Sequence, residues 1–218
     1  MKGQKIFNRV DSLFQLVYYF SKLNILFIAY SFRGAILLGI FPAIYALMQI
    51  IMKGDIKEVS SRMRNDFYSL YKSAFSKANA VGWSLSVVGI IFYLNILAMN
   101  SGKVEYSLLN IIPFFTLLLL FITVSIWIFP LYVRTSLSLK NLFKYSLIIG
   151  VLNSHYTIVS FVMIFIVIYV SLLYPALLLF FAVSVSSYLL LNVTDKSMSI
   201  LDIENLVTST EKKQGRVE

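Results

Sequence analysis

Long apolar runs alternate with short polar segments along almost the whole chain. A bilayer is crossed by roughly 20 apolar residues, and about six runs reach that length. The predicted spans are about 13–32, 35–52, 81–99, 106–132, 145–170 and 172–193. Each run is too long and too evenly apolar for a barrel strand, and only a helix satisfies its own backbone in lipid. The pattern therefore predicts an all-α, polytopic transmembrane bundle that forms a single domain over 1–195.

The first two predicted spans share one apolar stretch. Residues 12–51 run for about forty positions, which is enough for a hairpin that turns near Arg33 and Gly34. Three polar residues weaken its first half: Gln15, Lys22 and Asn24. If this stretch holds one span instead of two, five spans remain and the N-terminus changes sides.

An amphipathic segment, 56–77, separates the second predicted span from the third. Its apolar residues recur at steps of three and four, which places them on one face of a helix. They are Ile56, Val59, Met63, Phe67, Leu70 and Ala74. Basic residues lie elsewhere around the helix: Lys57, Arg62, Arg64 and Lys72. A basic helix between membrane spans is expected to lie at a membrane surface or under a partner.

The composition agrees with a membrane protein. Of the 218 residues, 59% are hydrophobic and 13% are charged, against about 25% charged in a typical soluble domain. The chain has no cysteine and one histidine, so disulfides, thiolate metal sites and histidine metal clusters are excluded. No cofactor is expected.

The net charge of +9 has a topological explanation. Lysine and arginine collect on the cytoplasmic side of a membrane, and most of the 19 basic residues fall there if both termini are cytoplasmic. This layout leaves Arg33 and Lys103 outside, and it makes 196–218 a polar cytoplasmic tail. Nucleic-acid binding is not expected, because no basic and aromatic groove motif accompanies the charge. The predicted location is a cell membrane.

The first hundred residues contain several short motifs: Leu23-Asn24, Leu38-Gly39-Ile40-Phe41-Pro42-Ala43, Asp66-Phe67, Tyr71-Lys72, Phe75, Lys77-Ala78-Asn79 and Gly82-Trp83. Together these motifs resemble the bacterial YesL family. The likeness covers roughly the first hundred residues, and the second half matches only in its rhythm of spans. The resemblance implies a multi-pass protein of mostly Gram-positive bacteria, often encoded beside carbohydrate ABC transporters, and it implies no catalytic residues.

Two groups of residues in the first hundred are candidates for a functional site. Gly39 and Pro42 could form a hinge or a tight packing seam, or simply a fixed kink. The amphipathic helix could lie in the interface, where its basic residues would meet anionic lipid headgroups. Alternatively, its aromatic and basic residues could dock onto a partner. The candidate partner-binding residues are Phe67, Tyr71, Lys72, Phe75 and Lys77.

The predicted spans contain few polar residues, and between 81 and 193 none of those inside a span is charged. The residues that could line a pathway for a solute are Asn24, Gln49, Asn95, Ser125, Thr157 and Ser160. Such residues are usually satisfied by their own or a neighbouring helix, whereas an ion-coupled pathway normally needs buried charges. His155 has no second histidine and no carboxylate near it in sequence, so a packed or interfacial role is expected. Known catalytic motifs are missing, and the protein is not expected to be an enzyme.

These observations favour a non-catalytic accessory subunit of a carbohydrate (oligosaccharide) ABC import system, binding the importer's transmembrane subunits. The alternative is a small-solute transporter or channel that acts by itself. Buried polar residues along a continuous cavity would favour the transporter, and a dry, tightly packed interior would favour the accessory subunit.

Overall fold

The computed structural model describes residues 2–54, 62–101 and 108–200, and every regular element in these ranges is a helix. The helices are α1 (Lys2–Arg33), α2 (Ile40–Lys53), α3 (Arg62–Asn100), α4 (Leu108–Arg134), α5 (Leu139–Leu152), α6 (Ser154–Leu173), α7 (Pro175–Phe180) and α8 (Ala182–Ile200). The prediction of an all-α protein is confirmed.

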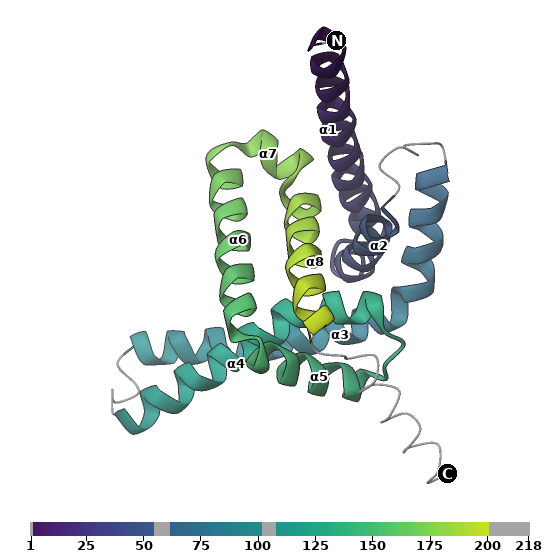
Figure 1. Cartoon of the computed structure of the whole chain (residues 1–218). Helices are drawn as coiled ribbons and strands as arrows, with labels where there is room; N and C mark the ends of the chain where they lie inside the picture. Colours follow the sequence, from purple (N-terminus) through teal and green to yellow (C-terminus); the bar gives the residue numbers. More distant parts are fainter. Residues whose placement is uncertain (1, 55–61, 102–107, 201–218) are drawn as a thin grey trace.

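The helices run in two main directions (Figure 1). α6 and α8 stand side by side and are joined at one end by the short α7, and α1 runs along the same general direction. α4 and α5 cross beneath them. The first half of α3 lies beside α2, and its second half extends with the start of α4 away from the other helices. These extended halves, 84–100 and 111–121, form a projecting arm.

Four described helices are long and apolar enough to cross a membrane. They are Val10–Arg33, Arg62–Asn100, Ile111–Arg134 and Ser154–Leu173. This agrees with the predicted helical membrane protein. The predicted span 35–52 differs, because 34–39 is a turn and α2 has only 14 residues. A helix of that length extends about 21 Å, which is less than the roughly 30 Å hydrocarbon core of a bilayer.

Other predicted boundaries also differ from the structure. The amphipathic segment and the span 81–99 belong to one continuous helix, α3, although 55–61 lie outside the described residues. The predicted span 145–170 is divided at Asn153, where the backbone leaves the helical region (φ −109°, ψ 44°). The span 172–193 is divided at Tyr174 and Phe181. Tyr174 is extended because a following proline disfavours helical geometry. The number of spans and the side of each terminus remain predictions.

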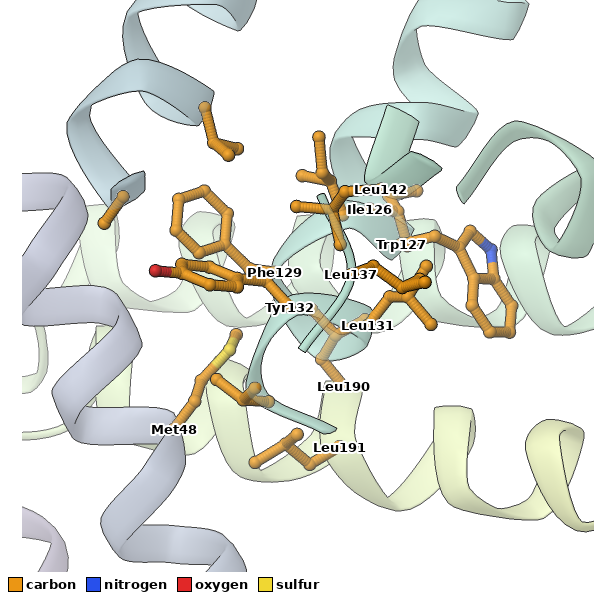
Figure 2. Packing of buried hydrophobic residues seen from close by; sticks show 14 of the residues in the cluster. Met48, Ile126, Trp127, Phe129, Leu131, Tyr132, Leu137, Leu142, Leu190 and Leu191 are labelled. Carbon is orange, nitrogen blue, oxygen red and sulfur yellow. The ribbon is translucent and has the colours of Figure 1, made fainter. Parts of the chain in front are cut away.

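Two groups of buried side chains hold the helices together. The first joins α2, α3, α4, α5 and α8 and includes the fully buried Trp127. Figure 2 shows Met48 of α2 and Leu191 of α8 on the same side of Trp127. The second joins α1, α2 and the start of α3 around Leu23, Leu47 and Phe67. The described part of the apolar face predicted for the amphipathic segment (Met63, Phe67, Leu70 and Ala74) is therefore packed against helices of the same chain, and Ile56 and Val59 lie outside the described residues.

Candidate functional site

The predicted partner-binding residues lie on the first half of α3, but most of them face inward. Phe67 is fully buried and Tyr71 is buried, while Phe75 is half-buried. The ring of Tyr30 on α1 stacks on Phe67, with 5.0 Å between the ring centroids, and it also contacts Tyr71 at 5.4 Å. These aromatic residues thus bind α3 to α1, while Lys72 remains exposed.

Lys77 contacts the junction of α4 and α5. Its ammonium group donates a hydrogen bond to the carbonyl of Leu137, at 2.5 Å, and lies 4.9 Å from the ring centre of Tyr132. Gln49 of α2 donates to the carbonyl of Val133, at 2.6 Å. Both side chains therefore bind backbone carbonyls at the junction of α4 and α5. They connect this junction to α2 and α3.

The turn between α1 and α2 has an unusual backbone. Ala35 and Ile36 have positive φ angles of 54° and 62°, in the left-handed region that a β-branched residue rarely occupies. The amide of Leu37 donates to the carbonyl of Ala35, at 2.7 Å, which closes a three-residue turn around Ile36. A conformation of this kind costs about 1–3 kcal/mol per residue and persists only where its surroundings impose it.

Glycines at both ends of the turn allow this conformation. A Cβ atom at Gly34 would lie 2.4 Å from the Cα of Gly39, and one at Gly39 would lie 2.2 Å from the carbonyl oxygen of Ser31. Asn79 of α3 donates to the carbonyl of Leu38, at 3.0 Å. The turn is thus pressed between α1 and α3.

Gly39 therefore lies at a packing point, and its role as a hinge stays a prediction. Pro42 is buried in the first turn of α2. A proline there removes no intrahelical hydrogen bond, because the first N–H groups of a helix have no acceptor within it. The change of direction comes from the turn, and α2 is not kinked by Pro42.

Arg33, at the end of α1, lies over two aromatic rings, one on α1 itself and one on α3. Its guanidinium carbon is 4.9 Å from the ring centre of Tyr68 on α3 and 6.0 Å from that of Tyr30 on α1. Arg33 is exposed, as are the side chains of Ile36, Leu37 and Leu38 beside it. We call this surface the Arg33 corner, and it consists of Tyr30, Arg33, Ile36, Leu37, Leu38 and Tyr68.

The sequence did not single out this corner. The predicted layout has Arg33 outside the membrane, on the side opposite the basic residues of the amphipathic segment. In the structure Arg33 and Tyr68 are direct neighbours, which does not fit this separation, and the side on which Arg33 lies stays a prediction. The paired glycines, Gly34 and Gly39, were the available signal that a tight turn and not a span follows Arg33.

Polar side chains within the helices are mostly satisfied by backbone groups. Asn24 is fully buried, and its amide bonds four backbone groups at the break between α7 and α8. Thr157 accepts a hydrogen bond from the indole of Trp127, at 2.8 Å, and donates to the carbonyl of Gly150. Asn95 and Ser125 each donate to the carbonyl four residues earlier. Ser160 is buried on α6.

A mainly apolar cleft of about 600 Å³ opens between α4 and the corner of α5 and α6. Its walls include Phe115, Leu119, Ile158 and Phe161, and its few polar members include Thr123 and Thr157. His155 is exposed near the cleft, with its ring against that of Tyr156. Within the described ranges, histidine, aspartate and glutamate form no group of three that could hold a metal ion.

Comparison with known proteins identifies relatives of unknown function. Residues 20–96 match the model of a family described as "Protein of unknown function, DUF624". The chain is 26% identical over 171 residues to the uncharacterized protein YteU of Bacillus subtilis strain 168, covering 78% of this chain and 76% of YteU. It is 27% identical over 135 residues to the uncharacterized protein YesV of the same strain, covering 60% of this chain and 63% of YesV. No solved structure matches the chain significantly. The Arg33 corner lies inside the region that matches the family.

Proposed function

We propose that this protein is a YesL-like, non-catalytic accessory subunit of a carbohydrate ABC import system in a bacterial cell membrane. It would bind the importer's transmembrane subunits within the bilayer and stabilise them or bias their conformational equilibrium. Such an effect requires only a difference in affinity between two states of the importer. The carbohydrate context comes from the resemblance to the YesL family.

The observation that carries this proposal is the use of polar groups in the described helices. Asn24, Gln49 and Lys77 bind backbone carbonyl or amide groups of neighbouring segments of the same chain. The polar groups of these three side chains therefore stabilise the fold of the chain itself. The cleft, whose lining is mainly apolar, offers no row of charged groups for an ion-coupled solute. This arrangement supports a protein that acts by contact.

The projecting arm supplies the contact surface. The rings of Phe92 on α3 and Phe114 on α4 meet edge to face, with 5.7 Å between centroids, and hold its two halves together. Apolar side chains on the outside of the arm are more than half exposed. They include Val87, Ile90, Ile91, Leu94, Phe115 and Leu119. Membrane helices associate mainly by close packing, and the arm offers two such helices away from the rest of the fold.

Affinity purification of the tagged protein from native membranes tests the proposal. Mass spectrometry would measure the importer subunits recovered per tagged protein. A tryptophan at Ile90 or Leu94 would obstruct close packing while the arm stays apolar, so recovery is expected to fall several-fold. The matched control is Ile166→Trp on α6, which is similarly exposed and lies outside the arm. Wild-type protein that recovers no importer subunit would contradict the proposal.

A further inference from the structure

We propose that the Arg33 corner binds the phosphate group of an anionic phospholipid, with Ile36, Leu37 and Leu38 lying among its acyl chains. The corner lies at the end of the helix Val10–Arg33, one of the four described helices of membrane-spanning length. The end of such a helix reaches the boundary between acyl chains and headgroups. A lipid offers both chemistries that the corner presents, an anion and an apolar chain.

The guanidinium group of Arg33 is held in place by aromatic rings and remains available to bind a phosphate group. It lies over the rings of Tyr68 and Tyr30, which restrain its plane by cation–π contact. No carboxylate in the described part of the chain lies within ion-pair distance of it. A guanidinium stacked on rings still directs its N–H groups outward in a fork that matches two phosphate oxygens.

The end of α1 does not cancel this charge. The C-terminal carbonyls of a helix carry partial negative charge, which would repel a phosphate if they were unpaired. Here the amides of Gly34, Ala35 and Ile36 donate to the carbonyls of Tyr30, Phe32 and Ser31, at 3.3, 3.0 and 2.9 Å. The turn therefore caps the helix and leaves the guanidinium as the dominant charge.

Neighbouring charges on α3 add to the attraction. Arg64 and Lys72 lie one helical turn before and after Tyr68, on the same face, and both are exposed. Asp66 is also exposed, but two residues from Tyr68 it faces a different direction around the helix. The face toward the corner is thus basic, which complements an anionic headgroup.

The strained turn explains how the apolar part is presented. Ile36, Leu37 and Leu38 have exposed fractions of 47%, 64% and 46%, and their backbone is held by the glycine contacts and by Asn79. Three adjacent aliphatic side chains beside a cation would be a poor surface toward water. At the edge of the acyl chains they are stabilised by burial.

Native mass spectrometry of the purified protein tests the proposal without any importer. Phosphatidylglycerol, phosphatidylcholine and inorganic phosphate would be added separately at equal concentration. We expect retained phosphatidylglycerol to fall about fivefold in Arg33→Ala, the effect of one basic residue near an anionic surface. Arg33→Lys is expected to give an intermediate loss, since lysine keeps the charge without the fork. The control is Lys140→Ala, an exposed basic residue on α5.

A second variant, Leu37→Gln, keeps the charge and removes one apolar contact, so it is expected to weaken retention of phosphatidylglycerol less than Arg33→Ala does. Equal retention in Arg33→Ala and wild type would overturn the proposal. So would retention of inorganic phosphate equal to that of phosphatidylglycerol, which would indicate a site for free phosphate. Because the assay uses the purified protein alone, its result is independent of the proposed accessory function.

Discussion

The buried side-chain amide of Asn24 forms hydrogen bonds with the backbone where α7 ends and α8 begins. Its Nδ2 donates to the carbonyls of Leu178 and Leu179, at 3.2 and 2.7 Å, and its Oδ1 accepts from the amides of Val183 and Ser184, both at 3.1 Å. These are the helix-terminal groups that a break leaves without intrahelical partners. An amide carries both a donor and an acceptor, so it can serve both helix ends.

Replacing Asn24 by leucine is expected to lower the free energy of unfolding by about 2–3 kcal/mol. The replacement leaves four backbone groups at the helix break without these partners, and each loss costs about 0.6 kcal/mol or more inside a membrane protein. Asn95→Leu is the control, because Asn95 is exposed and donates to Ile91 of its own helix. Unfolding in detergent, followed by loss of helical signal, measures both. Equal effects at the two sites would contradict the role given to Asn24.

The positive φ angle of Ile36 predicts a substitution that raises the free energy of unfolding. Glycine adopts this conformation freely, so Ile36→Gly removes about 1–3 kcal/mol of strain and costs about 0.5–1 kcal/mol in the entropy of the unfolded chain. A net stabilisation of about 1 kcal/mol is expected in the same unfolding measurement. Leu37→Gly is the matched control next to it and should destabilise, because the positive φ angles are at Ala35 and Ile36. A destabilised Ile36→Gly protein would show that the turn is not strained.

Among the elements, α4 faces a glycine of α5 and a glycine of α3, and the two positions differ in their tolerance of a side chain. A Cβ atom at Gly150 of α5 would lie 2.3 Å from Thr123 Cγ2 and 2.8 Å from Trp127 Cδ1. A Cβ atom at Gly89 of α3 would have Phe121 Cζ as its nearest neighbour, at an ordinary 3.5 Å. Close approach of α4 and α5 therefore requires glycine at 150 and does not involve Gly89.

Gly150→Ala is accordingly expected to destabilise the protein by about 1–3 kcal/mol, the usual cost of overpacking a close contact. Gly89→Ala should be neutral or stabilising by up to about 1 kcal/mol, because alanine favours a helix over glycine. The thermal midpoint of each variant provides the comparison. Adding Thr123→Ser, which removes the methyl group in closest contact, should recover part of the loss in Gly150→Ala. A lack of recovery would place the defect elsewhere.

The pattern of apolar residues predicted some elements well and others poorly. The spacing of Met63, Phe67 and Ala74 identified the buried face of α3, because helical periodicity is local. It did not identify what covers that face, and Tyr30 of α1 proved to be the neighbour instead of a partner protein. The break at Phe181 was also missed, since the amide that supports it lies more than 150 residues away in sequence.

For the whole molecule, the short α2 bears on the predicted path of the chain through the membrane. The six-span layout requires the chain to cross once at 13–32 and again at 35–52, so that Arg33 and Lys72 lie on opposite sides. α2 is a helix of 14 residues, and Arg33 contacts Tyr68, one helical turn from Lys72. The contact places the end of α1 and the start of α3 together. This arrangement agrees with the five-span alternative, in which one span precedes α3.

Cysteine labelling tests this arrangement directly, because the natural chain has no cysteine. Single cysteines at Leu37 and Ser69, both exposed, are expected to react with a membrane-impermeant maleimide from the same side of sealed vesicles. A cysteine at Ser12, near the other end of α1, should react from the opposite side, because about 20 helical residues separate it from Arg33 and extend about 30 Å. Labelling of positions 37 and 69 from opposite sides would restore the hairpin of two spans and remove the Arg33 corner as one surface.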